Sequence, residues 1–197
     1  MIVTVASFKG GVGKTTTSVH IAAYLQKFKP TLLVDGDPNR SATSWLKRGS
    51  LPFKVIDERL LAKYGRDFEN IVIDTEARPS EEDVATLVEG CDLLVLPTTP
   101  DVLALDALGL TIESLEKIGA KNYKVLLTIV PPRPSHDADE ARAMLQSSGI
   151  PVFKSQISRR VAFQKAALAG FIVSEIKDPR SESAWKEYSA VGKEIKK

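Results

Sequence analysis

The sequence has almost no cysteine and no long hydrophobic run, and each shortage excludes a class of protein. The single cysteine, Cys91, cannot form an internal disulfide, and one thiol cannot supply the ligand cluster of a structural zinc or iron–sulfur site. No apolar stretch approaches the roughly 18 residues that a membrane-spanning helix needs. No basic leader precedes the first apolar residues, Met-Ile-Val-Thr-Val. We therefore expect a protein of the reducing cytoplasm.

The 197 residues have the average composition of one globular domain, 43% hydrophobic and 26% charged. No repeat or Pro/Ser-rich linker divides residues 1–197, so we expect a single domain. Short apolar runs alternate with helical patterns, which predicts an α/β fold with a mostly parallel sheet flanked by helices. The expected strands are Ile2–Ser7, Thr31–Asp35, Ile71–Asp74, Asp92–Leu96 and Tyr123–Val130. The expected helices are Lys14–Phe28, Asp101–Lys117, 137–148, 159–169 and Ser181–Lys196.

Charge is distributed unevenly along the chain. The net charge is only +2, but from Pro151 onward ten Lys and Arg residues stand against five Asp and Glu. This excess of positive charge favours an anionic partner for the last quarter of the chain. Ordinary solvated lysines would give the same composition, and composition alone leaves the two interpretations open.

A glycine-rich segment joins the first expected strand to the first expected helix, and it reads Lys9-Gly10-Gly11-Val12-Gly13-Lys14-Thr15-Thr16. Its end matches a phosphate-binding loop, although Phe8 stands where that pattern has its first glycine. Glycines let backbone N–H groups approach phosphate oxygens at a helix N-terminus. The pattern predicts that Lys14 neutralises the β- and γ-phosphates and that the Thr15 hydroxyl binds Mg²⁺. A dinucleotide-binding loop would require glycine at position 16, where the chain has Thr16.

This loop resembles that of the deviant Walker ATPases, the family of ParA and MinD, whose loop carries an extra lysine near its start, matched here by Lys9. Four further segments are similar to the family's motifs in the same order and extend the resemblance over nearly the whole chain. They are Leu33–Pro38 (first switch), Ile71–Thr75 (Walker B strand and second switch), Leu96–Pro100 and Ile157–Arg160. The chain is similar in length to small ParA-type partition ATPases, and McdA-type positioners of protein compartments are close relatives.

The resemblance implies a P-loop ATPase that uses ATP and Mg²⁺, dimerises when ATP is bound and partitions or positions cargo. A ParB-type or McdB-type adaptor would stimulate hydrolysis. Lys9 would reach the partner subunit's nucleotide, as an arginine finger does. Asp37 would act on the attacking water, Asp37 and Asp74 would hold Mg²⁺ through water, and Asp35 would support the loop. The segment Thr128–Arg133 occupies the family's base-binding position, where Pro131 and Pro132 either pack on adenine or merely end a strand.

One motif departs from the family pattern. Family members usually follow the Walker B aspartate with small residues, whereas this chain has Glu76 and Arg78 in that stretch. These two residues either alter the second switch or form a surface ion pair of little energetic value.

The resemblance implies DNA as the anionic partner of the basic last quarter, because ParA-type dimers bind DNA without sequence preference. The expected DNA contacts are Arg160, Arg159, Lys165 and Lys154, on a surface separate from the phosphate loop, in a protein associated with the nucleoid. A MinD-like membrane ATPase is the competing class, which would need an exposed apolar face on the last helix. The stripe Trp185, Tyr188, Val191 and Ile195 is more typical of a core, so we expect no membrane binding. Reductase relatives share a cluster through two cysteines per subunit, which this chain lacks.

Overall fold

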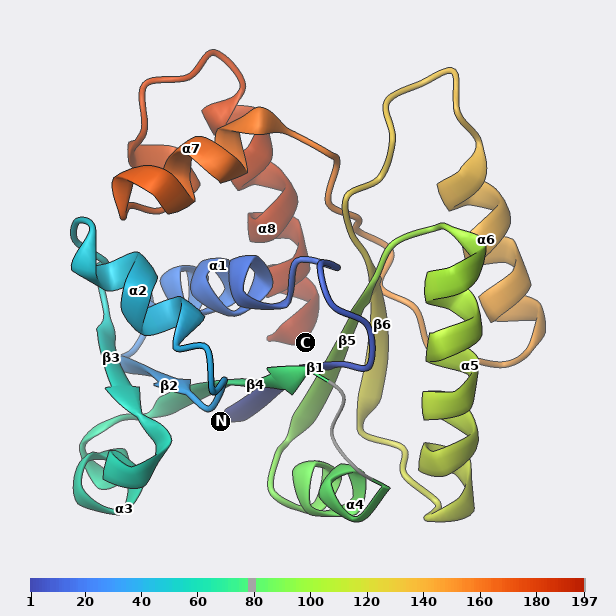
Figure 1. Ribbon diagram of the computed structural model, residues 1–197, viewed down its shortest axis with the longest axis horizontal. Coiled ribbons are helices and arrows are strands. Elements are labelled where there is room, and N and C mark those ends of the chain that lie inside the picture. The colour runs from blue at the N-terminus through green and yellow to red at the C-terminus, as the bar shows by residue number, and fades with distance from the viewer. Residues whose placement is uncertain (78–80, 197) are drawn as a thin grey trace.

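The described residues, 1–77 and 81–196 of the computed structural model, form a six-stranded parallel sheet covered by helices (Figure 1). The strand order is β3-β2-β4-β1-β5-β6. The strands are β1 (Ile2–Ser7), β2 (Thr31–Asp35), β3 (Lys54–Asp57), β4 (Asn70–Ala77), β5 (Leu93–Thr98) and β6 (Tyr123–Leu127). All neighbouring pairs are parallel, which confirms the predicted α/β class.

Helices lie on both faces of the sheet. One face carries α1 (Lys14–Gln26), α2 (Ser41–Lys47), α7 (Val161–Ala169) and α8 (Ser181–Ile195). The other carries α3 (Leu61–Tyr64), α4 (Glu81–Glu89), α5 (Val102–Lys117) and α6 (Asp137–Ser147) (Figure 1). Short 3₁₀ turns, η1 (Glu58–Leu60), η2 (Gly65–Asp67) and η3 (Val173–Glu175), complete the described secondary structure. None of the described helices is long and apolar enough to cross a bilayer.

Strand β2 shows why a continuous apolar run folds here as a strand buried on both faces. Leu33 packs with the core under α1 and α8, whereas Leu32 and Val34 point the other way into the cluster beside α3. All three side chains are fully or almost fully buried. The alternation confirms the expectation for the run Thr31–Asp35, because successive side chains of a strand face opposite sides.

The sequence patterns missed the short elements between β2 and β4 and the helix after β4. Strand β3 has only four residues, so it is too short to show an alternation. Helix α2 begins after Arg40, which has a left-handed backbone (φ 53°) instead of a capping side chain. The predicted last helix is confirmed within two residues, and its stripe belongs to the core, since Tyr188 and Val191 are buried.

Helices α1 and α8 are joined by a buried polar contact as well as by apolar packing. His20 of α1 is fully buried, and its Nδ1 lies 2.7 Å from the carbonyl oxygen of Thr16. Its Nε2 accepts the backbone N–H of Val173 (3.1 Å), and its ring stacks on Tyr188 of α8 at a centroid distance of 4.7 Å. Burial lowers the pKa of His20 to about 4, so the imidazole is neutral at pH 7. The hydroxyl of Tyr188 lies 3.1 Å from that of Thr17, which anchors α8 to the first turn of α1.

The close packing of α1 on α8 generates a stability prediction at Gly192. A Cβ added at this buried glycine of α8 would overlap the ring of Tyr24 in α1. We expect Gly192→Ala to lower the free energy of unfolding by about 1–3 kcal/mol, the usual cost of overpacking a core. Chemical denaturation measures this change. Gly109→Ala is the matched control, because a Cβ on that glycine of α5 meets nothing within 4 Å. It should raise the stability by about 0.5–1 kcal/mol through helix propensity alone; equal effects of the two substitutions would contradict the packing argument.

Candidate active site

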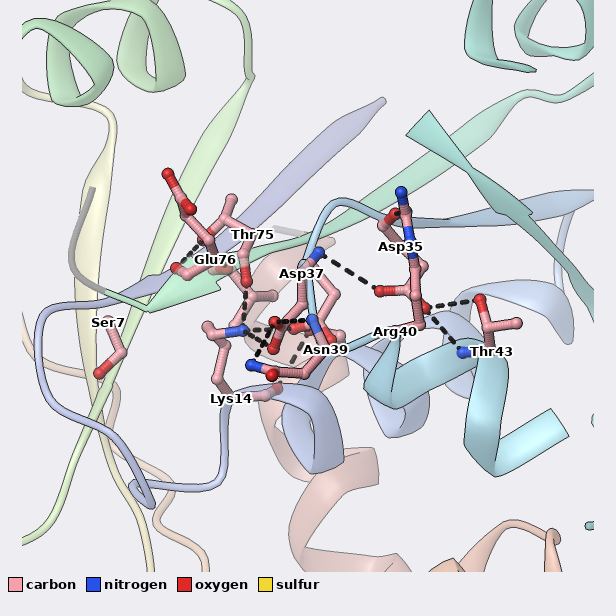
Figure 2. Close-up of polar contacts among 12 residues, drawn as sticks. Ser7, Lys14, Asp35, Asp37, Asn39, Arg40, Thr43, Thr75 and Glu76 are labelled. Atoms are coloured by element: carbon pink, nitrogen blue, oxygen red, sulfur yellow. Dashed lines mark hydrogen bonds and ion pairs between the residues drawn. The ribbon is translucent and has the colours of Figure 1, made fainter. Parts of the chain in front are cut away.

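The order of the strands brings three functional segments to one edge of the sheet. Strands β2, β4 and β1 are consecutive neighbours, and parallel strands all end at the same edge. The glycine-rich loop follows β1, the Asp35–Asp37 turn ends β2, and Asp74 lies near the end of β4. Figure 2 shows side chains from these three segments converging on Lys14.

The glycine-rich loop has the backbone that a phosphate-binding loop needs. Gly11 and Gly13 have positive φ values of 81° and 84°, a conformation that a side chain would strain. Gly13 directly precedes α1, so the loop ends at the helix N-terminus, where backbone N–H groups favour an anion. A Cβ at Gly10, Gly11 or Gly13 would meet nothing within 4 Å, so the approach to this backbone is open. Both the conformation and the open face fit a bound phosphate chain.

Lys14 is the buried cation of this edge. Its Nζ donates a hydrogen bond to the carbonyl oxygen of Thr75 and lies 3.3 Å from Oδ1 of Asp74. The same ammonium lies 3.6 Å from Oδ2 of Asp37. The structure therefore brings together three predicted residues, Lys14, Asp37 and Asp74, around one charge.

Asp74 is completely buried, and its surroundings fit a role beside a hydrated metal ion. Burial raises the pKa of Asp74, while the Lys14 charge and the Thr15 and Ser18 hydroxyls act in the opposite direction. Ser18 donates to Oδ1 (2.9 Å), but Oδ2 has no hydrogen-bond partner among the described residues. A buried carboxylate oxygen of this kind requires a donor, and a metal-bound water would supply one.

The donor set also fits Mg²⁺ held jointly with phosphate. Across residues 1–77 and 81–196, no group of three or more His, Cys, Asp or Glu side chains could hold a metal by itself. Mg²⁺ is usually held by one or two protein oxygens together with substrate phosphates and waters. The Thr15 hydroxyl and the carboxylates of Asp37 and Asp74 are hard oxygen ligands of the required type.

Asp35 and Asp37 shape the turn between β2 and α2. Oδ2 of the buried Asp35 accepts the backbone N–H (2.8 Å) and the hydroxyl (2.6 Å) of Thr43 in α2, and Oδ1 accepts the N–H of Asp37 (3.3 Å). Asp37 in turn accepts both the backbone N–H and the side-chain amide of Asn39 on Oδ1. Asp35 therefore fixes the turn, and Oδ2 of Asp37 is left facing Lys14 (Figure 2).

The second lysine of the loop, Lys9, has a different environment from Lys14. Its side chain is 34% exposed, and its Nζ lies 2.8 Å from Oδ1 of Asp101, the residue that caps α5. Hydrogen bonds from Lys9 and Thr99 lower the pKa of Asp101. One loop thus presents one cation inward and one cation at the surface.

A cavity of about 670 Å³ lies against the glycine-rich loop. Its lining includes Lys9, Gly10, Gly11 and Gly13 through Thr16, together with Asp37 and Asn39. The opposite part of the wall comes from Thr128 and Ile129 and from Ile157–Arg160, Phe163, Gln164, Ala167 and Tyr188. A volume of this size accommodates a nucleotide.

The base-binding expectation for Pro131 and Pro132 does not match this wall. Neither proline lines the cavity, whereas Thr128 and Ile129, just before them, do. Ile129 has a positive φ of 51°, which is strained for a β-branched residue and is the kind of outlier found at functional sites. The cavity wall therefore includes the start of the expected segment Thr128–Arg133, and the proline pair lies beyond this turn.

The four predicted DNA-binding residues differ in their exposure and in their ion pairs. Arg159 and Lys154 are exposed, and Lys165 is exposed but forms an ion pair with Asp178 at 2.7 Å. Arg160 is only 19% exposed and its Nη2 lies 2.6 Å from Oε1 of Glu187. Arg159 and Arg160 both line the cavity, so the expectation that Arg160 lies on a surface separate from the phosphate loop is wrong. The segment 157–160 folds back beside residues 128–130 through a bridge between Val130 and Ser158.

Sequence reasoning missed several residues of the site. Asn39 follows Asp37 by two positions, a spacing typical of a side-chain turn, and Ser18 lies one helical turn after Lys14. Both signals were present in the sequence. Glu187 is separated from Arg160 by 27 residues and no local pattern connects them. Glu76 is exposed, and Arg78 lies outside the described residues.

The sequence comparisons decide the family. The profile described as the CobQ/CobB/MinD/ParA nucleotide binding domain matches residues 3–172. The chain belongs to this family. It is therefore a nucleotide-binding ATPase of the ParA/MinD type.

Individual relatives in this ParA/MinD family match most of the chain. The maintenance of carboxysome distribution protein A of Gloeobacter kilaueensis is 36% identical over 98% of this chain and 93% of its own length. Protein ParA of Rhizobium radiobacter is 30% identical over 82% of this chain and 80% of its own length. The solved structure of a Cyanothece McdA variant in complex with ATP has a TM-score of 0.70 at 20% identity, covering 97% and 96% of the two chains.

The position of Lys14 generates the first prediction for the site. We expect Lys14→Ala to weaken ATP binding at least about a hundredfold, because the phosphates lose a charge-assisted partner and the two buried acids lose their counter-charge. Calorimetric titration with Mg²⁺ and ATP measures the change. Lys29→Ala removes an exposed lysine paired with Glu69 and serves as the control. Near-native ATP affinity in the Lys14 variant would contradict the phosphate-loop assignment.

The position of Asp37 generates a second prediction. We expect Asp37→Ala to retain ATP binding but to hydrolyse ATP on the order of a hundredfold more slowly, because it removes a group that acts on the water rather than on the phosphates. The measurements are turnover and ATP affinity in parallel. Asp57→Ala, at the end of the adjacent strand β3, is the control for a general loss of acidic charge. Undiminished turnover of the Asp37 variant would rule out this role.

Proposed function

We propose that this ATPase is a switch that dimerises with ATP, binds nonspecific DNA in that state and positions or partitions a cargo in the cytoplasm, on the nucleoid. An adaptor of the ParB or McdB type stimulates its hydrolysis. The similarity of this chain to a carboxysome distribution protein and to the chromosome-partitioning ATPase Soj of Thermus thermophilus supports both kinds of cargo, a protein compartment and a DNA molecule.

The observation that carries this proposal is that the two lysines of the glycine-rich loop, Lys9 and Lys14, have different environments. Lys14 is enclosed by Asp37, Asp74 and the carbonyl of Thr75, in the loop that would bind the phosphates of its own nucleotide. Lys9 is partly exposed, and its ammonium group pairs with the exposed Asp101. A surface ion pair of this kind is weak, so Lys9 is free to exchange Asp101 for a more highly charged partner.

The chemistry follows from the arrangement of these groups. Mg²⁺ bound beside Thr15 would neutralise charge on the β- and γ-phosphates. Lys14 would leave the acids for the phosphates. Asp74, whose Oδ2 has no hydrogen-bond partner among the described residues, would help to hold the metal ion through water. Asp37 orients the attacking water, while Asp35 fixes the turn that carries it. Lys9 of the partner subunit adds positive charge to the transition state, so hydrolysis depends on dimerisation.

The trans role of Lys9 gives a prediction with a geometric test. We expect Lys9→Ala to bind ATP but to fail to dimerise and hydrolyse it, and Lys14→Ala to be inactive alone. In a mixed dimer, the Lys14→Ala subunit supplies Lys9 to the intact loop of its partner. Turnover should recover to roughly a quarter to a half of the wild-type rate per dimer, because only one of its two sites is complete. No recovery in mixtures proven to contain the mixed dimer would contradict action in trans.

The DNA contacts are assigned to the exposed cations of the last quarter, Arg159, Lys165 and Lys154. Arg160 is not included among these contacts, because its guanidinium pairs with Glu187 and its side chain is mostly buried. Three contacts from each subunit would neutralise about six phosphates, so the slope of log affinity against log salt should be roughly −5. DNA binding should require ATP, since the monomer offers half of these contacts.

The DNA assignment is tested by a double substitution and a distant control. We expect Arg159→Ala with Lys165→Ala to weaken binding to all duplex sequences alike and to make the salt slope shallower by about 4, one unit per lost phosphate contact in the dimer. Lys117→Ala, at the end of α5 across the molecule from α7, should change neither quantity (Figure 1). Equal DNA affinity in ATP and ADP would overturn the proposed switch. Binding to anionic liposomes instead of DNA would identify a MinD-like membrane function.

A further inference from the structure

Two glutamates of α8, Glu187 and Glu194, accept hydrogen bonds from two different parts of the segment 154–160. Glu194 accepts the backbone N–H groups of Lys154 (3.0 Å) and Ser155 (2.8 Å) and pairs with Lys124 (3.2 Å). Glu187, two helical turns earlier, accepts the backbone N–H (2.9 Å) and the hydroxyl (2.8 Å) of Ser158. The two carboxylates therefore do the same structural work on neighbouring parts of the segment 154–160.

Only the part that Glu187 holds belongs to the cavity. Ser158 and Arg160 line it, whereas Lys154, Ser155 and Lys124 do not. The next residue of α8, Tyr188, also lines the cavity and contacts the hydroxyl of Thr17 in α1. This turn of α8 therefore connects the wall at 158–160 with the helix that begins at the phosphate loop.

Arg160 has an N–H donor without a partner among the described residues. Its Nη2 lies 2.6 Å from Oε1 of Glu187, which leaves the guanidinium fixed in the wall of the cavity. Its Nε is buried and has no hydrogen-bond partner among the residues that the structure describes. A guanidinium carries five N–H donors, and Arg160 lines the cavity, so a bound ligand with acceptor oxygens or nitrogens would be stabilised beside it.

We propose that Arg160 contacts the nucleotide bound in this cavity and that Glu187 is the positioning residue that holds it there. The ligand class is a nucleotide, whose phosphate and ribose oxygens and base nitrogens are all acceptors that a guanidinium can bind. Glu187 fixes the orientation of the guanidinium before the nucleotide enters, so the cost of ordering a long side chain does not fall on binding. This inference rests on the proposed nucleotide site and adds two residues to it.

The two glutamates provide a matched experiment in the full-length chain. Glu187→Gln and Glu194→Gln keep the size and a carbonyl acceptor for the backbone N–H groups, but each removes the charge that its cation faces. Arg160→Gln removes the guanidinium itself. Calorimetry with Mg²⁺ and ATP, and separately ADP, gives the dissociation constants, and thermal melting of each variant reports the change in stability.

We expect Arg160→Gln and Glu187→Gln each to weaken nucleotide binding about tenfold, the effect of losing a charge-assisted hydrogen bond. The double variant should be no weaker than the Arg160 single variant by more than about twofold, because the two residues act as one unit. Glu194→Gln should leave nucleotide affinity within about twofold of wild type even if it lowers the melting temperature by as much as Glu187→Gln.

Three results would overturn the proposal. One is equal nucleotide affinity of Glu187→Gln and Glu194→Gln, which would make Glu187 a structural clasp only. Another is a double variant whose nucleotide affinity falls by the product of the factors measured for the two single variants. The third is an Arg160 variant that loses DNA binding while its nucleotide affinity is unchanged, which would support the sequence-based assignment of Arg160 as a DNA contact. The Lys14→Ala variant distinguishes a wrong site from wrong residue roles. If this variant also binds ATP normally, the assignment of the nucleotide site is wrong. If it does not bind ATP normally, only the roles of Arg160 and Glu187 are wrong.

Discussion

The buried ammonium group of Lys14 is the charge on which the rest of the site depends. Two carboxylates, those of Asp37 and Asp74, lie within 3.6 Å of it, and a backbone carbonyl accepts its hydrogen bond. A buried cation is stable only with such partners, and two buried carboxylates are compatible only with a cation between them. When Lys14 turns to phosphate, the acids need another positive group, and Mg²⁺ beside the same phosphates would provide it. We therefore expect nucleotide and metal binding to be coupled through this one side chain.

The strand order brings together the elements that the proposed switch would use. Because β2, β4 and β1 are neighbours, Lys14 contacts both the turn after β2, through Asp37, and the end of β4, through Asp74 and Thr75. Asp35 ties the first of these to α2 through Thr43. On the other wall, α8 contacts the first turn of α1 through Tyr188 and holds residues 158–160 through Glu187. The surfaces proposed for a second subunit and for DNA both adjoin elements that meet at the nucleotide.

Much of this arrangement could be predicted from the sequence, and the reason lies in the range of the interactions. The glycine-rich loop, the apolar run of β2 and the stripe of α8 are local patterns, and each has the predicted structure. Strand β3 and helix α2 are short and carry no pattern of their own, because tertiary contacts define them. The same distinction holds within the site. Lys14 and Asp37 follow from their motifs, whereas the pairing of Arg160 with Glu187 depends on the packing of α8 against a distant segment. A motif at 157–160 indicated a basic residue, but only the fold shows that it faces the cavity.

The central claim is that Lys14 exchanges its protein partners for phosphate when nucleotide binds. The most direct measurement is a crystal structure of the chain with Mg²⁺ and a non-hydrolysable ATP analogue. The account predicts that Nζ of Lys14 contacts the β- and γ-phosphate oxygens, that the carbonyl of Thr75 loses this hydrogen bond and that Oδ2 of Asp74 binds a metal-coordinated water. A bound nucleotide with Lys14 still paired to Thr75 and Asp74 would contradict it.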